Sequence, residues 1–264
     1  MTNDHDARMR FAIELARRAG ELALNYFRDL ENLTIESKGH QDLVSQADRE
    51  VELFIRAAIA RDYPQDGIIG EEHASVAGST GYVWVIDPID GTANFVRGIP
   101  AWCVVIACAR DGEAVVGVIH EPSTGETFHG RRGGGAFLNG RPIRTSAATS
   151  LEEGSVGTGL SNRAEAENVA VLISRILAEG GVFFRNASGA LMLAYVASGR
   201  LLGYVEEHMN AWDCVAGMLV VEEAGGTIVK PDPRTVLGDG TLVIASGKTV
   251  FPKLRELCEQ AFKL

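Results

Sequence analysis

The sequence lacks the features of a membrane-spanning or secreted protein. No apolar run approaches the roughly 20 residues that a bilayer-spanning helix needs. The first six residues are polar or acidic after Met1 and contain no apolar signal segment. The four cysteines form no Cys-x-x-Cys pair, and two of them lie in apolar runs, so we expect reduced thiols without disulfides. These absences favour a cytoplasmic protein that does not bind membranes.

Basic charge is also scarce. The net charge is −10, and basic pairs such as Arg17-Arg18 and Arg131-Arg132 are isolated. Because contacts to nucleic-acid phosphates need clustered Lys and Arg, nucleic acid is not expected as a partner. An acidic protein can still bind a small anion where cations or backbone dipoles supply the positive charge. The 264 residues, 46% of them hydrophobic, suffice for one large α/β domain or two joined lobes.

The most informative stretch runs from Tyr82 to Phe95. An apolar, β-branched run ends in Asp87 and Asp90, and Gly91-Thr92 follows. A buried strand would deliver Asp87 to its carboxyl end, where open α/β sheets bind their ligands. A helix starting at Thr92 would direct its free N–H groups toward both aspartates. Two interpretations stay open from this stretch alone: an aspartate that caps a helix, or carboxylates that hold cations for a phosphate.

The elements before this stretch are two amphipathic helices and a short strand. Apolar spacing predicts a helix over residues 6–29 and a second one from Ser45. Asp48 lies three residues after Ser45, so a capping box already gives it a structural role. Gly70-Glu71-Glu72 follows a strand at 68–69, and a hairpin or crossover would put Glu71 beside Asp87. Residues 68–145 are predicted to form a largely antiparallel sheet covered by the two helices.

After residue 154 the pattern changes to alternating strands and helices. The predicted strands are 154–159, 182–184, 201–205, 227–229 and 242–245, and the predicted helices are 163–179, 188–199, 211–224 and 249–262. This alternation is typical of an α/β lobe. We therefore predict an α+β N-terminal lobe over residues 1–145, tightly joined to an α/β lobe over residues 146–264, with the seam near Gly133-Gly134-Gly135 and the 140s.

A second group of carboxylates lies between the predicted strand 201–205 and helix 211–224. Glu206 and Glu207 precede His208, and Asp213 falls in the first turn of the helix. Judged alone, Asp213 is better explained as a helix-start residue and Trp212 as a packing residue. Together with Glu71, Asp87 and Asp90, however, these acids form an all-oxygen set, which selects Mg²⁺ over Zn²⁺. Two such ions about 4 Å apart can clamp a phosphate, so a metallohydrolase is the hypothesis.

The motifs resemble those of the inositol monophosphatase family over nearly the whole chain. The matching segments are Asp87-Pro88-Ile89-Asp90-Gly91-Thr92, Gly70-Glu71-Glu72, Trp212-Asp213, Glu223-Ala224-Gly225-Gly226, Asp42-Leu43-Val44-Ser45, Asp48 and Lys38. The resemblance implies an αβαβα sandwich of the inositol monophosphatase and fructose-1,6-bisphosphatase type. It also implies a homodimer and Mg²⁺-dependent hydrolysis of phosphate monoesters.

The resemblance assigns metal ligands by position. It implies that Glu71, Asp87 and the backbone carbonyl of Ile89 hold one ion. Asp87, Asp90 and Asp213 would hold a second, and Glu71 a more weakly bound third, so two to three Mg²⁺ ions are expected.

The resemblance also assigns catalytic and phosphate-binding residues. Thr92, with Glu71, would orient the attacking water, with Asp48 behind it. The amides of Gly91 and Thr92 would receive the phosphate, in agreement with the helix-start argument above.

For the alcohol part of the substrate the resemblance implies Asp90, Gly189 and Glu206 as contacts, with Asp213 beside them and Ser161 as a neighbour. The family's usual Gly-Ser/Thr-Ala-Ala reads Ala187-Ser188-Gly189-Ala190 here, and the segment before Trp212 reads Glu207-His208-Met209-Asn210. Both departures lie where the leaving alcohol is expected to bind.

The substrate therefore remains open, as a small phosphorylated polyol or amino alcohol. Inositol 1-phosphate leads, and histidinol phosphate comes next because Glu207 near Glu206 could attract an ammonium group. Fructose 1,6-bisphosphate and 3′-phosphoadenosine nucleotides are further alternatives on the same scaffold. A binding or regulatory protein that kept the fold without the reaction is an alternative of another class.

Overall fold

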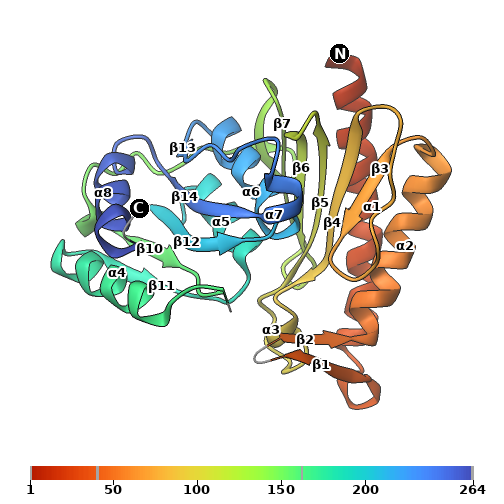
Figure 1. The fold of residues 1–264 in the computed structure, drawn as a ribbon, viewed down its shortest axis with the longest axis horizontal. Coiled ribbons are helices and arrows are strands. Elements are labelled where there is room, and N and C mark those ends of the chain that lie inside the picture. The colour runs from red at the N-terminus through yellow and green to blue at the C-terminus, as the bar shows by residue number, and fades with distance from the viewer. Residues whose placement is uncertain (1, 40–41, 162, 263–264) are drawn as a thin grey trace.

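The computed structural model describes residues 2–39, 42–161 and 163–262, which form five stacked layers (Figure 1). Helices and sheets alternate across the molecule, which confirms the predicted αβαβα sandwich. The helix layers are, in order, α1 (Thr2–Phe27) with α2 (Gln46–Asp62), α5 (Gly189–Ala197) with α6 (Ala211–Glu223), and α4 (Ala166–Ala178) with α8 (Phe251–Phe262). The sequence Gly39-His40-Gln41 favours a loop, but His40 and Gln41 lie outside the described residues.

The first sheet has seven strands in the order of the sequence. They are β3 (Gly67–Gly70), β4 (Tyr82–Asp90), β5 (Cys103–Arg110), β6 (Glu113–Glu121), β7 (Glu126–Arg131), β8 (Gly135–Leu138) and β9 (Arg141–Pro142). Strands β3 and β4 are parallel and all other neighbours are antiparallel, as the predicted largely antiparallel sheet requires. Gly70 pairs with Ile86 across the parallel pair, which decides where Glu71 lies.

Both faces of this sheet are buried, which explains why β4 reads as a continuous apolar run. Trp84 and Ile86 belong to the core beneath α1 and α2. Val85 belongs to the second core, which α5 and α6 cover. Asp87 follows Val85 by two residues and therefore faces the middle helix layer. Strand β4 thus directs Asp87 toward helices α5 and α6, which come later in the sequence.

The second sheet has five strands in the order β11-β10-β12-β14-β13. They are β10 (Ser155–Thr158), β11 (Val182–Phe184), β12 (Gly203–Met209), β13 (Thr227–Ile228) and β14 (Thr241–Ser246). The prediction that the strand at 201–205 ends at residue 205 and that 206–210 form a loop is wrong. Strand β12 continues because it pairs with β14 as far as Met209 and Thr241, with an irregularity after Glu206. Glu206 and His208 of this strand line a pocket, and polar residues at these positions conceal the strand pattern.

Several short elements were not predicted. They are the hairpin of β1 (Ile35–Gly39) and β2 (Asp42–Ser45), strands β8 and β9, the helix α7 (Val236–Asp239), and the 3₁₀ turns Leu30–Asn32 and Leu151–Glu153. The helix expected at Thr92 is a single turn, α3 (Thr92–Phe95). Within the described residues, no helix combines the length and apolar character needed to cross a bilayer.

The predicted lobe boundary at 145/146 falls between the two sheets. Helices α5 and α6 nevertheless pack on the first sheet, so the two predicted lobes share one core. The three glycines near the predicted seam form the turn between β7 and β8, where the Glu223 carboxylate accepts hydrogen bonds from all three amides at 2.8–3.1 Å. The division into lobes stays a prediction.

Candidate active site

A bulge at the end of β4 brings Asp87 and Asp90 to the same face of the sheet. Asp87 pairs with Val105 and Asp90 with Cys103, so three steps on β4 match two steps on β5. In a regular strand, residues three apart point to opposite faces, and one extra residue restores the same face. The Asp-Pro-Ile-Asp spacing therefore produces two converging carboxylates because the strand is bulged there.

Asp213 reaches the same point from the middle helix layer. It lies in the first turn of α6, where its carboxylate accepts hydrogen bonds from the backbone N–H of Asn210 at 3.2 Å and from its side-chain amide at 3.3 Å. One oxygen from each of Asp87, Asp90 and Asp213 lies within 4.8 Å of the other two. Two acids of one strand and a third more than a hundred residues further along the chain thus form one cluster.

Glu71 lies next to this cluster as the first residue after β3. Because Gly70 is level with Ile86 in the parallel pair, Glu71 follows level with Asp87. Its negative charge is the largest contribution after burial to raising the pKa of Asp87. The predicted juxtaposition of Glu71 and Asp87 is confirmed, and the connection between their strands is a crossover.

The electrostatics of the cluster are dominated by burial and mutual repulsion. Burial, and then the charges of Glu71, Asp90 and Asp213, raise the pKa of Asp87 well above its usual value. Burial, followed by the charge of Asp90, raises the pKa of Asp213 to about 7. Burial also raises the pKa of Asp90, although hydrogen bonds from Ser188 and the α5 amides oppose this effect.

A hard divalent cation fits this set of donors. The charges that act most strongly on Asp87 are those of other carboxylates, so a bound cation would relieve their mutual repulsion. All its donors are carboxylate oxygens, the ligands that Mg²⁺ prefers. The arrangement can therefore hold cations and, through them, an anion.

Asp48 joins the N-terminal cap of α2 to the turn after β4. One carboxylate oxygen accepts hydrogen bonds from the Ser45 amide at 2.9 Å and the Ser45 hydroxyl at 2.5 Å. The Asp48 amide donates in return to the Ser45 hydroxyl oxygen, which completes the predicted capping box. The other oxygen accepts a hydrogen bond from the Thr92 hydroxyl at 2.9 Å. The same hydroxyl lies 3.0 Å from the carbonyl oxygen of Ile89. Asp48 therefore has the structural role and also a direct contact to Thr92.

Gly91 has a backbone conformation that favours glycine. Its φ is +97°, and a Cβ atom there would lie 3.0 Å from the carbonyl oxygen of Ala101 and 3.2 Å from the Cβ of Ser188. It precedes α3, whose first N–H groups have no intrahelical partner, as in any helix. The amides of Gly91 and Thr92 thus lie at the start of this turn, next to Asp90.

Asp90 also binds the N-terminus of α5. Its carboxylate accepts hydrogen bonds from the Ser188 hydroxyl at 2.6 Å and from the amides of Gly189 at 3.2 Å and Ala190 at 2.8 Å. Ala187 precedes these donors with φ +61°, a conformation that an L-residue rarely adopts. The segment that departs from the family pattern is therefore tied directly to the acidic cluster.

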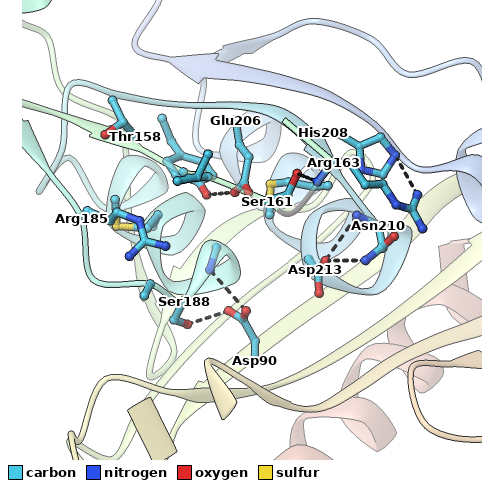
Figure 2. A pocket seen from close by; sticks show the side chains of 17 residues that line it. Asp90, Thr158, Ser161, Arg163, Arg185, Ser188, Glu206, His208, Asn210 and Asp213 are labelled. Atoms are coloured by element: carbon cyan, nitrogen blue, oxygen red, sulfur yellow. Dashed lines mark hydrogen bonds between the residues drawn. The ribbon is translucent and has the colours of Figure 1, made fainter. Parts of the chain in front are cut away.

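A pocket with a volume of about 180 Å³ opens beside Asp90 and Asp213 (Figure 2). The predicted alcohol-side residues Asp90, Ser161, Gly189, Glu206 and Asp213 all line it. Glu206 accepts a hydrogen bond from the Tyr204 hydroxyl, and burial raises the pKa of Glu206 to about 7. In the view of Figure 2, Glu206 faces the two aspartates across the pocket.

Glu207 does not belong to this pocket, so the argument that it could attract an ammonium group there is wrong. Side chains alternate along a strand, and Glu206 and Glu207 are neighbours on β12. Glu206 lines the pocket, whereas Glu207 accepts hydrogen bonds from the side-chain amide of Asn168 at 3.1 and 3.3 Å. Glu206 and Glu207 point to opposite faces because β12 extends to Met209, which the sequence did not predict.

Several polar residues of the pocket were missed by the sequence reasoning, among them Tyr204, Arg163, Arg185 and Thr158. Arg163 and Arg185 lie at opposite sides of it in Figure 2, and Arg163 contacts the His208 ring at 3.2 Å. The buried Thr158 hydroxyl also lines the pocket. Arg185 could have been noticed from its position two residues before Ala187, whereas Arg163 carries no local signal.

Comparison with known proteins identifies the relatives of this fold and site. The model of the inositol monophosphatase family matches residues 4–262. The chain belongs to the inositol monophosphatase family. The family is metal-dependent, and its members named inositol-1-monophosphatase are phosphoric monoester hydrolases, so this chain is a phosphatase of that class.

Individual relatives agree with the family assignment. An inositol-1-monophosphatase from Mesorhizobium japonicum is 37% identical over 90% of this chain and 91% of its own length. A fructose-1,6-bisphosphatase/inositol-1-monophosphatase from Thermotoga maritima is 37% identical over 84% of both chains. The crystal structure of the extragenic suppressor protein SuhB from Bartonella henselae superposes with a TM-score of 0.91 at 34% identity, covering 96% of this chain and 99% of that one.

Proposed function

We propose that this chain is a Mg²⁺-dependent phosphatase whose preferred substrate is inositol 1-phosphate. The observation that carries the proposal is the cluster of Asp87, Asp90 and Asp213 at the edge of a small polar pocket. Carboxylates crowded in this way favour divalent ions, and the adjoining pocket offers hydrogen-bonding groups to a compact polyol.

The proposed metal ligands are those expected from the sequence. Glu71, Asp87 and the Ile89 carbonyl would hold one Mg²⁺, and Asp87, Asp90 and Asp213 would hold a second, with Glu71 also contributing to a weaker third. When bound, the ions neutralise charge on the phosphate and lower the pKa of a coordinated water. The amides of Gly91 and Thr92 donate to the phosphate oxygens from the start of α3.

Thr92, Asp48 and Glu71 are the proposed catalytic residues. Because the Thr92 hydroxyl donates its proton to Asp48, its lone pairs are directed to accept a hydrogen bond from an attacking water. Glu71 accepts a hydrogen bond from the other O–H of that water. The carboxylate of Asp48 is fixed by Ser45, so the orientation of the Thr92 hydroxyl is set before the substrate binds.

On the alcohol side, Glu206, Asp90 and Asp213 accept hydrogen bonds from substrate hydroxyls, and the amide of Gly189 lies beside them. A ring with several hydroxyl groups matches this surplus of acceptors.

A second candidate substrate is a sugar bisphosphate such as fructose 1,6-bisphosphate. Arg163 and Arg185 line the pocket away from the acidic cluster, where a second phosphate would reach. The Thermotoga maritima relative bears the name of both activities.

The test is the ratio kcat/KM for inositol 1-phosphate, fructose 1,6-bisphosphate, histidinol phosphate and 3′-phosphoadenosine 5′-phosphate, measured with purified enzyme and saturating Mg²⁺. We expect inositol 1-phosphate to give the highest value. Faster hydrolysis of fructose 1,6-bisphosphate, reduced selectively by Arg185→Gln, would instead establish the second candidate. Absence of Mg²⁺-dependent hydrolysis of all four substrates would contradict both.

We also propose that the protein forms a homodimer through the edge strand β11. We further propose that it is located in the cytoplasm. Val182, Phe183 and Phe184 are 57%, 45% and 39% exposed, next to the exposed Leu177 of α4. Three consecutive exposed apolar residues on a sheet edge are unfavourable in water and favour pairing with a second copy. The four cysteines are buried and reduced, which supports a reducing compartment.

A further inference from the structure

Glu52, on the buried face of α2, is a charged residue that neither the metal site nor the pocket uses. Its side chain is fully buried, which is rare for a carboxylate without a specific partner. The carboxylate accepts hydrogen bonds from the backbone amides of Glu72 at 2.7 Å and His73 at 3.2 Å. These two amides belong to the residues that immediately follow Glu71.

Arg56 lies one helical turn further along α2 and completes the contact. Its Nε donates to Oε1 of Glu52 at 2.6 Å, and its two Nη atoms donate to the carbonyl oxygens of His73 at 2.9 Å and Ala74 at 3.0 Å. Glu52 and Arg56 therefore hold both the N–H and the C=O groups of the segment after β3. We name this pair the Glu52–Arg56 clamp.

The geometry of β3 couples the clamp to the acidic cluster. Gly70 faces α2, since a Cβ atom there would overlap Oε1 of Glu52. Side chains alternate along a strand, so Glu71 points to the opposite face, toward Asp87. The sheet holds the chain as far as Gly70, and the clamp holds it from Glu72 onward. Glu71 is thus fixed by its backbone on both sides.

We propose that Glu52 is a positioning residue, which orients Glu71 toward the metal site by fixing the backbone of Glu72 and His73. The effect on metal binding rests on the proposed function of Glu71 as a ligand. The clamp itself is independent of any ion. Without the clamp, Glu71 is still present as a ligand, but its carboxylate is free to move. We therefore expect a lower metal affinity with the same set of ligands.

The substitution Glu52→Gln tests this directly. A glutamine keeps the shape of the side chain but replaces one acceptor oxygen by an NH₂ group, which cannot accept from an amide or from Arg56. The matched control is Glu50→Gln, since Glu50 lies on the exposed side of the same helix and contacts Tyr26 and Gln46.

The first readout is amide hydrogen exchange of the metal-free proteins. We expect the amides of Glu72 and His73 to exchange at least about 10-fold faster in Glu52→Gln and at the wild-type rate in Glu50→Gln. Unchanged exchange in Glu52→Gln would overturn the clamp, whatever the enzyme's substrate is. This result does not depend on the phosphatase proposal.

The second readout is the Mn²⁺ dissociation constant from calorimetry, measured in wild type, Glu52→Gln, Glu71→Gln and the double variant. We expect Glu52→Gln to weaken binding by about 5- to 50-fold in the wild-type background and by less than about 2-fold when Glu71 is already Gln. An equal effect in both backgrounds, or faster exchange with unchanged Mn²⁺ affinity, would show a purely structural residue and overturn the proposal.

Gly70→Ala provides a second variant if Glu52→Gln folds poorly. The added methyl group displaces the Glu52 carboxylate without removing its charge. We expect the same faster exchange at Glu72 and His73, and wild-type exchange at these amides would overturn the clamp. Failure of Mn²⁺ to bind wild type at all would instead contradict the proposed metal site, while the exchange data would still report on the clamp.

Discussion

The Thr92 hydroxyl lies 2.9 Å from Oδ1 of Asp48, a residue that also belongs to the capping box of helix α2. The contact spans 44 residues of sequence and joins the outer helix layer to the turn at the end of β4. It gives the side chain of Thr92 a fixed direction, and the cap gives Asp48 a fixed position. A residue with an evident structural role can therefore also orient a catalytic group.

The first prediction concerns Thr92. We expect Thr92→Val to lower kcat at least about 100-fold with little change in KM, because the hydroxyl that orients the water is lost while the fold is kept. Thr92→Ser keeps the hydroxyl and should retain most of the activity. Steady-state kinetics with equal Tm values for both variants would check this. Similar kcat values for the valine and serine variants would show that the hydroxyl has no catalytic role.

The second prediction concerns the stability of the metal-free enzyme. Asp87→Asn should abolish turnover, yet raise the Tm of metal-free protein at pH 7.5 by a few degrees, because it removes a repelling buried charge. The pKa of Asp87 is raised in the folded state, so its folded form binds more protons than its unfolded form. Asp87 therefore destabilises the fold increasingly as the pH rises above the ordinary pKa of an aspartate, and this effect disappears on acidification.

The corresponding measurement is the Tm of both proteins from pH 5 to pH 8, with EDTA and then with Mg²⁺. The advantage of Asp87→Asn should shrink toward low pH, and Mg²⁺ should raise the Tm of wild type only. If the metal-free variant were less stable than wild type at pH 7.5, repulsion between the buried carboxylates would not destabilise the metal-free protein.

The third prediction concerns two histidines of the first sheet. Burial lowers the pKa of His120 and of His129 to about 4. The unfolded chain binds these protons below pH 6.5 and the folded chain does not, so stability falls as the pH is lowered. The expected loss is about 2 kcal/mol per histidine between pH 7 and pH 5.

Urea unfolding of wild type and the His120→Gln/His129→Gln double variant at both pH values measures this contribution. The carboxylates are common to both proteins and cancel in the comparison. We expect the variant to lose clearly less stability on acidification. Parallel pH profiles would mean that both imidazoles are protonated in the folded protein.

The fourth prediction concerns assembly through β11. Phe183→Asp should convert a dimer into a monomer, because the charge would be buried at the proposed interface. Leu53→Asp is the control, since Leu53 is also an exposed apolar residue (52%) but lies on α2. Sedimentation velocity at micromolar concentration distinguishes the two. A wild-type monomer, or a dimer that survives Phe183→Asp, would refute this interface.

Much of the architecture could be predicted because local patterns agree with the final structure. The apolar run of β4, the cap at Ser45 and the strand–helix alternation after residue 154 each report directly on their element. The placement of Glu71 followed from the chain order alone. The motifs that carry the family resemblance also contain the residues that converge in space.

What could not be predicted depends on contacts between distant segments. The predicted strand is shorter than β12 because Glu206, Glu207 and His208 look like loop residues. The pairing of β12 with β14 extends the strand, and its polar residues are explained by the pocket that Glu206 and His208 line and by the contact of Glu207 with Asn168. The same error placed Glu207 in the pocket. Glu52 gave no signal either, because a glutamate in an amphipathic helix reads as a surface charge until the segment after β3 is seen packing against it.

The central claim is that Asp87, Asp90 and Asp213 share divalent ions with Glu71. Anomalous scattering from crystals grown with Mn²⁺ tests it most directly. We expect strong peaks about 2.1–2.3 Å from carboxylate oxygens of these four residues, and their loss in Asp87→Asn crystals. Ordered, active wild-type protein with saturating Mn²⁺ and no peak among these carboxylates would contradict it.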